Sequence, residues 1–114
     1  MMTPIVDEPC AATAGYPQRM PRPSRPQPYA LSADWPHAPS SDPAGEAARL
    51  LALNLAAAIR GRSARSVEAA TGIDHTVIGK ILNGKTWADL ATITRLENAF
   101  DCDLWPTRSQ RRNG

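Results

Sequence analysis

The uneven distribution of proline limits most strongly how this 114-residue chain can fold. Ten of its eleven prolines lie within residues 1–43, and the last is Pro106. Proline lacks a backbone donor and breaks the interior of a helix, so a helical domain has to begin near residue 43. Residues 1–43 also have few large apolar side chains and no helical or alternating period, so they cannot offset their ordering entropy by burial. We therefore predict that they form a disordered arm rich in Pro, Ala and Ser.

Two short aromatic segments are the exception within this arm. They are Tyr29-Ala30-Leu31 and Trp35-Pro36. Isolated aromatics in such a tail either dock on the domain that follows or remain solvated, and the sequence leaves both readings open. Because the arm lacks other core residues, we expect a chain starting near Pro43 to fold as well as the full chain.

Beyond residue 43 the apolar residues follow the period of an α-helix. Leu51, Leu55 and Ile59 recur every four residues, which predicts a first amphipathic helix over residues 44–60. Gly61 is expected to end this helix, because glycine readily enters the left-handed region.

Two short helices follow, separated by a tight turn. Ser63 is a good amino-terminal cap for a second helix that ends at Gly72. Asp74 then caps a third helix, over residues 75–83, and Gly84 closes it. The residues expected to face inward from the turn and the third helix are Ile73, Ile78, Ile81 and Leu82.

A fourth helix is predicted from a capping-box pattern at Thr86-Trp87-Ala88-Asp89. Its inward face would consist of Leu90, Ile93, Leu96 and Phe100. Residues 107–114 are basic and are expected to form a flexible tail. The fold class predicted for residues 44–106 is therefore all-α, a compact bundle of four to five short helices.

Charge and cysteine content narrow the possible partners. Residues 44–114 hold ten basic and seven acidic side chains, a net charge of +3 that suits a polyanion. Cys10 and Cys102 show no CxxC or Cys/His spacing, which indicates neither a disulfide framework nor a zinc site. No cofactor, metal or small-molecule ligand is expected.

Two further classes of protein are disfavoured. No apolar run approaches the ~20 residues that span a bilayer, and the first residues lack a secretory pattern, so we expect a soluble, cytoplasmic protein. The chain has no glycine-rich phosphate loop and no Ser/His/Asp or Cys/His pairing, and its two histidines are His37 and His75. An enzyme is therefore not expected.

The spacing of the second and third helices is the most specific functional feature. Two short helices joined by the tight turn Gly72-Ile73-Asp74 form a helix-turn-helix. In this geometry one helix crosses the phosphate backbone of DNA while the next enters the major groove.

Four motifs carry a resemblance to a known family. They are Thr71-Gly72-Ile73-Asp74-His75-Thr76 across the turn, Ile78 with Ile81, Asn83-Gly84-Lys85-Thr86, and Leu90-x-Thr92-Ile93-x-x-Leu96-Glu97. With them, residues 63–105 resemble the lambda-repressor-like, Cro-type (XRE) helix-turn-helix family. The segment Leu104-Trp105-Pro106 also resembles actinobacterial and actinophage members of that family.

One position departs from the family pattern. Four residues before the turn glycine the family prefers alanine, because the two helices approach closely there, whereas this chain has Glu68. Either Glu68 is rotated outward and Ala69 and Ala70 make the close contact, or the two helices pack differently.

The resemblance implies which residues contact DNA. Base edges would be read by His75, Thr76 and Lys80, with Val77 and Gly79 beside them. Lysine donates to guanine O6 and N7, while threonine and histidine can bond base edges or phosphates. Phosphates would be bound by Ser63, Arg62, Arg65, Asn83 and Lys85. The alternative for each charged residue is a solvated position without a DNA contact.

The function that follows is sequence-specific binding of double-stranded DNA by a transcriptional regulator, a repressor of phage-immunity, Cro-like or chromosomal type. The alternative is the DNA-binding antitoxin of a toxin–antitoxin pair, whose arm folds on its toxin. Only Tyr29-Ala30-Leu31 and Trp35 could form a toxin-binding patch, which weighs against this alternative. The operator sequence, and whether the protein binds it as a monomer or a homodimer, stay open.

Overall fold

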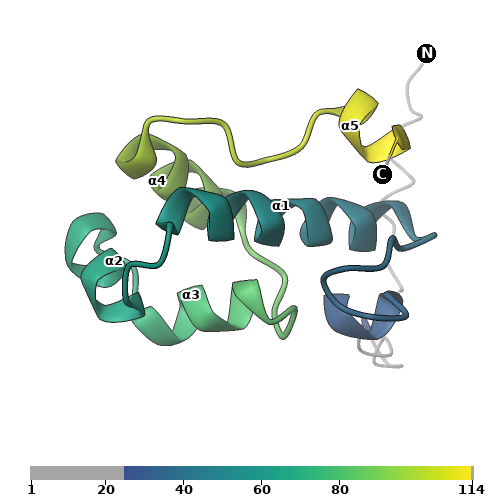
Figure 1. The fold of residues 1–114 in the computed structure, drawn as a ribbon, viewed down its shortest axis with the longest axis horizontal. Coiled ribbons are helices and arrows are strands. Elements are labelled where there is room, and N and C mark those ends of the chain that lie inside the picture. The colour runs from purple at the N-terminus through teal and green to yellow at the C-terminus, as the bar shows by residue number, and fades with distance from the viewer. Residues whose placement is uncertain (1–24, 114) are drawn as a thin grey trace, which may run out of the picture.

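Residues 25–113 are described by the structure, a computed structural model, and they are organised around helices (Figure 1). In chain order these are the 3₁₀ turn η1 (Pro28–Leu31) and the helices α1 (Pro43–Ile59), α2 (Ala64–Thr71), α3 (His75–Leu82), α4 (Leu90–Phe100) and α5 (Arg108–Asn113). No strand occurs within residues 25–113. The predicted all-α bundle of short helices is confirmed. No helix in this part of the chain has the length and apolar character needed to cross a bilayer.

The long helix α1 is the centre of the bundle. Figure 1 shows α3 along one side of α1 and α5 on the other, with α2 and α4 near the carboxyl end of α1. Buried apolar side chains from α1 to α4 and the segment after α4 form one core: Leu51, Leu55, Ile59, Val67, Ile73, Ile78, Ile81, Ile93, Leu96 and Leu104. The four-residue spacing seen in α1 thus marks its buried face, as predicted.

Both ends of α2 and the start of α3 follow the predicted caps, whereas α3 ends at Leu82, one residue before the predicted end. The Ser63 hydroxyl accepts a hydrogen bond from the Ser66 N–H at 3.1 Å, and Gly72 ends α2 in the left-handed conformation at φ 78°. The end of α1 differs from the prediction by one residue. Arg60, at φ 55°, already adopts the left-handed conformation before Gly61, and its N–H donates to the Ala56 carbonyl at 3.1 Å.

The predicted start of α4 is wrong. The helix begins at Leu90 and its cap is Asp89, not the predicted Thr86, because the Asp89 carboxylate accepts a hydrogen bond from the Thr92 N–H at 2.7 Å. Trp87 is held outside the helix, since its indole N–H donates to the Pro26 carbonyl at 3.0 Å. With this later start, the first turn extends past the core and Leu90 is 80 % exposed, contrary to the predicted inward face.

Residues 25–42, which we call the N-terminal strap, pack on the helical domain. The Trp35 indole N–H donates to the Leu82 carbonyl at 2.9 Å, and the Tyr29 N–H donates to the Gly84 carbonyl at 3.0 Å. The strap therefore contacts the carboxyl end of α3, and the expectation of a disordered arm up to residue 43 is wrong for it. The reason is that two aromatic residues find partners far along the chain. The rest of the predicted arm, residues 1–24, lies outside the described residues.

A buried ion pair on α1 also holds the strap. Glu46 and Arg49 are only 3 % and 6 % exposed. The Glu46 carboxylate accepts from Arg49 Nε at 2.9 Å and from the Ser40 N–H at 2.8 Å. Arg49 Nη1 donates to the Pro36 carbonyl at 3.1 Å. Each charged group thus bonds both its partner and the backbone of the strap.

The basic end of the chain differs from the predicted flexible tail. Arg108–Asn113 form the short helix α5, which packs on α1. Thr107 and Gln110 form a reciprocal cap, in which the Thr107 N–H donates to Gln110 Oε1 at 2.8 Å and the Gln110 N–H donates to the Thr107 hydroxyl at 3.1 Å. This is a capping box that was not predicted from the sequence.

Candidate nucleic-acid interface

The site is built on the angle between α2 and α3. Val67 on α2 and Ile78 on α3 are both 0 % exposed and belong to the same core cluster. Ile73, between the two helices, is buried with them, as predicted. Because the inner faces of both helices are packed in this way, the bundle fixes their relative orientation and leaves their outer faces free.

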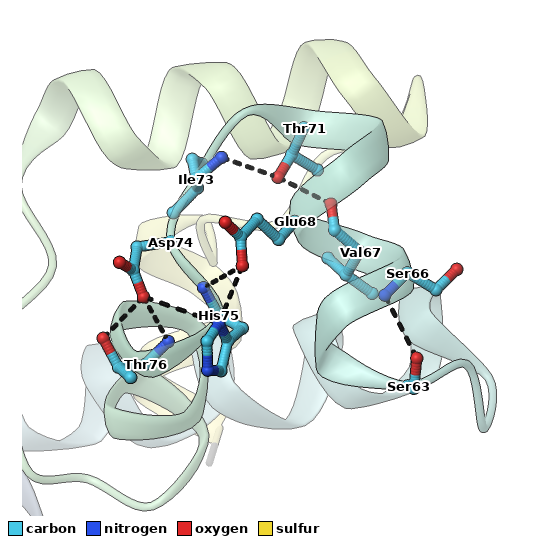
Figure 2. Close-up of polar contacts among 9 residues, drawn as sticks. All are labelled: Ser63, Ser66, Val67, Glu68, Thr71, Ile73, Asp74, His75 and Thr76. Atoms are coloured by element: carbon cyan, nitrogen blue, oxygen red, sulfur yellow. Dashed lines mark hydrogen bonds and ion pairs between the residues drawn. The ribbon is translucent and has the colours of Figure 1, made fainter.

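Local hydrogen bonds define the turn (Figure 2). The Thr71 hydroxyl donates to the Val67 carbonyl at 2.8 Å and accepts from the Ile73 N–H at 3.1 Å. Asp74 Oδ1 accepts from the Thr76 hydroxyl at 2.6 Å and from the Thr76 N–H at 2.7 Å. These two hydrogen bonds from Thr76 hold the pKa of the Asp74 carboxyl below its ordinary value. Asp74 is thus an ionised cap at the start of α3.

At position 68, where the chain departs from the family pattern, the Glu68 side chain contacts His75. Its Oε1 atom lies 2.7 Å from His75 Nδ1 and accepts the His75 backbone N–H at 3.1 Å (Figure 2). The hydrogen bonds from the His75 side chain and then from its backbone lower the pKa of the Glu68 carboxyl. Ala69 and Ala70 are both exposed, which rules out the alternative in which they make the close contact. Glu68 instead joins α2 to the first turn of α3.

The five residues predicted to face the bases occupy different environments on α3. Thr76 and Lys80 are exposed, and His75 is half-buried. Val77 is also half-buried, because it packs against the core. A Cβ atom added at Gly79 would meet nothing within 4 Å, so this position is open on the protein side. The structure therefore brings His75, Thr76 and Lys80 to an accessible surface and places Val77 partly beneath it.

The residues predicted to bind phosphate flank this surface. Arg65 lies exposed on α2, and Asn83 and Lys85 lie exposed after α3. The Ser63 hydroxyl accepts the capping hydrogen bond described above, so its own proton remains available to another acceptor. The Arg62 guanidinium lies over the Phe100 ring, 5.7 Å from the ring centre, which ties it to α4. The structure thus places these side chains on α2, directly before α2 and directly after α3.

Glu68, Asp74 and His75 also present one possible ligand atom each within 4.8 Å of one another. The contacting carboxylate oxygens already accept hydrogen bonds from His75 and Thr76. We therefore interpret this cluster as a pair of caps on α3. The role of Glu68 was not predicted from the sequence, although the departure of this residue from the family pattern was a signal that could have revealed it.

A known protein family matches the part of the chain that contains this site. Residues 58–104 match a family described as helix-turn-helix. The matched segment runs from the end of α1 to Leu104, and so includes α2, the turn, α3 and α4. No match to the chain was found among curated proteins or among solved structures.

Proposed function

We propose that this protein is a sequence-specific, double-stranded DNA-binding transcriptional repressor, because residues 58–104 match a helix-turn-helix family. The observation that carries the proposal is the packing of α3. Its inner face is locked into the core through Ile78 and Ile81, while Thr76 and Lys80 stay exposed on its outer side. A helix supported in this way can enter the major groove as a rigid element.

In this proposal the exposed side of α3 reads base edges. Lys80, one turn after Thr76, donates to guanine O6 or N7. Thr76 contacts a base edge or a thymine methyl, and His75 contacts a base at the amino end of the helix. Val77 packs beside these contacts, and the open position at Gly79 lets the backbone approach the duplex.

The flanking residues bind phosphates and position α3 without reading sequence. They are Ser63, Arg62, Arg65, Asn83 and Lys85. The net charge of +3 on residues 44–114 favours association with DNA of any sequence. This function implies that the protein is located in the cytoplasm and is associated with the nucleoid.

The proposal predicts binding that falls steeply with salt. Each phosphate neutralised by lysine or arginine releases counterion, so a few contacts give a log–log slope of about −3 to −6. Fluorescence anisotropy of a labelled duplex, titrated at several salt concentrations, measures this slope. A protein that binds no duplex, of any sequence, at ~50 mM salt contradicts the proposal.

A pair of variants separates reading from positioning. Lys80→Ala should cost about 1 to 3 kcal/mol on the preferred site and relax the preference at one base pair. Arg65→Ala should weaken all sequences about equally and reduce the salt slope by roughly one unit. Both are exposed positions, so neither substitution disturbs the core. Titrations against the preferred site and its single-base mismatches at two salt concentrations test this. A uniform loss for Lys80→Ala together with a changed base preference for Arg65→Ala shows that α3 is not the reading helix.

The docked strap bears on the antitoxin alternative. Trp35 and Tyr29 already contact the end of α3 through the Leu82 and Gly84 carbonyls. A toxin that bound the Trp35 side chain would have to displace it from the domain, whereas the Tyr29 side chain is 45 % exposed. This arrangement favours the repressor, whether of phage-immunity, Cro-like or chromosomal type.

A further inference from the structure

The contact between Glu68 and His75 has a consequence for base reading. Glu68 Oε1 lies 2.7 Å from His75 Nδ1, close enough for a strong hydrogen bond. An ionised carboxylate has acceptor sites only, so the hydrogen in this bond has to be on the imidazole. Glu68 is held in place by a second hydrogen bond, from the His75 backbone N–H at 3.1 Å. The neutral ring therefore carries its proton on Nδ1.

The other ring nitrogen is then an acceptor. A neutral imidazole with a proton on Nδ1 has an unprotonated Nε2. Figure 2 shows that the ring points its far nitrogen away from Glu68. In the major groove the hydrogen-bond donors of the bases are the amino groups of adenine N6 and cytosine N4, whereas guanine offers the acceptors O6 and N7. An acceptor at Nε2 can therefore accept a hydrogen bond from adenine or cytosine, but it cannot bond the acceptor atoms of guanine.

We propose that Glu68 is a positioning residue that fixes the tautomer of His75, so that Nε2 selects an adenine or cytosine amino group and rejects guanine. This inference rests on the proposed function, because it requires the amino end of α3 to lie in the major groove. It assigns a role in specificity to a residue on α2 that itself points toward α3 rather than toward a base.

The surroundings of the ring support the assignment to Glu68. Among the described residues, the charged groups in ion-pair contact with the imidazole are Glu68 from α2 and Asp74 from the turn. Asp74 Oδ1 lies 3.8 Å from Nδ1, beyond hydrogen-bond distance, and already accepts two hydrogen bonds from Thr76. Glu68 is thus the group that decides where the ring proton lies.

The first test needs no DNA. Two-bond ¹⁵N–¹H correlation spectra of the full chain, in mildly alkaline buffer, distinguish the two neutral tautomers of histidine. We expect His75 to show the Nδ1–H form in the wild type and to shift toward the Nε2–H form in Glu68→Ala. His37, which is exposed on the strap, provides the internal reference. An Nε2–H tautomer in the wild type, or an unchanged tautomer in Glu68→Ala, overturns the inference.

The second test measures base preference. Wild type, Glu68→Ala and His75→Ala each select duplexes from a randomised library, and the position that loses its preference in His75→Ala identifies the base read by His75. We expect adenine or cytosine there for the wild type, and a fall of about tenfold or more in the discrimination against guanine for Glu68→Ala. Asp103→Ala is the control for loss of one negative charge, because Asp103 is exposed and far along the chain from α3.

The outcomes separate this inference from the proposed function. Selection of guanine at the His75-dependent position, or the same preference in Glu68→Ala as in the wild type, overturns the inference and leaves the function standing. Failure of the wild type to enrich any duplex contradicts the function itself. Alanine is the residue that the family prefers at position 68, so Glu68→Ala should fold, and a circular-dichroism melt checks this.

Discussion

Glu46→Ala should lower the free energy of unfolding by about 3 to 5 kcal/mol, because it leaves the buried guanidinium of Arg49 without its partner. In the wild type Arg49 donates to Glu46 through Nε at 2.9 Å and through Nη2 at 2.5 Å. A small domain has a total stability of the order of 5 to 15 kcal/mol, so this loss is a large part of it. Urea unfolding followed by circular dichroism measures the effect.

The control for this variant removes both charges. In Glu46→Leu with Arg49→Met no buried charge remains unpaired, so the double variant should be more stable than Glu46→Ala. Both replacements keep the apolar volume near the strap. Loss of an exposed salt bridge costs about 1 kcal/mol or less. A loss this small for Glu46→Ala would therefore contradict a stabilising role for the buried pair of Glu46 and Arg49.

The same pair predicts a dependence of stability on pH. The hydrogen bonds from Arg49 are the main cause that holds the pKa of the Glu46 carboxyl below its ordinary value. A carboxyl with a depressed pKa in the folded state stabilises the fold above its unfolded-state pKa, and this contribution is lost as pH falls through the folded-state value. Unfolding curves at a series of acidic pH values should therefore show a smaller loss in Glu46→Gln than in the wild type. If the free energy of unfolding falls equally with pH in both proteins, groups other than Glu46 cause the loss of stability in acid.

Trp35→Ala should lower the free energy of unfolding by about 2 to 4 kcal/mol. The indole N–H donates to the Leu82 carbonyl at 2.9 Å, and the ring lies against Gly84, where an added Cβ would come within 2.7 Å of a ring atom. The substitution removes the hydrogen bond and opens a space between the strap and the end of α3. Thermal and urea melts of the variant measure the loss.

Two variants distinguish packing from hydrogen bonding at this position. Trp35→Phe keeps an aromatic ring but removes the donor, so it should cost about 1 kcal/mol or a little more. Trp105→Ala is the matched control, because Trp105 is 43 % exposed and its loss should cost less. If Trp35→Ala melts like the wild type, the strap does not stabilise the domain, as expected from the sequence if a chain starting near Pro43 folds as well as the full chain.

The candidate site could be predicted in part. The family resemblance places His75, Thr76 and Lys80 at the surface of the third helix, and the structure gives them an accessible position there. Whether they touch bases remains a prediction. Glu68 could not be assigned, because a glutamate within a helix is usually a solvated residue, and only the position of α3 shows what its carboxylate meets.

The sequence by itself determined both ends of α2 and the start of α3. Ser63, Gly72 and Asp74 end or begin these helices through hydrogen bonds and backbone angles that involve residues at most four positions away. The core face of α1 was equally predictable, since the period of an α-helix places every fourth residue on one side. Such features depend on local geometry, which the order of the residues fixes.

The tertiary structure alone decided the course of residues 25–42 and the position of Trp87 before α4. The bond from Trp35 to Leu82 joins residues 47 positions apart, and that from Trp87 to Pro26 joins residues 61 positions apart. No local pattern encodes partners at such a separation, because they meet only when the whole chain has taken its path. The buried pair of Glu46 and Arg49 follows the same logic: its i, i+3 spacing is typical of a solvated helix surface, and only the packed strap makes it part of the interior.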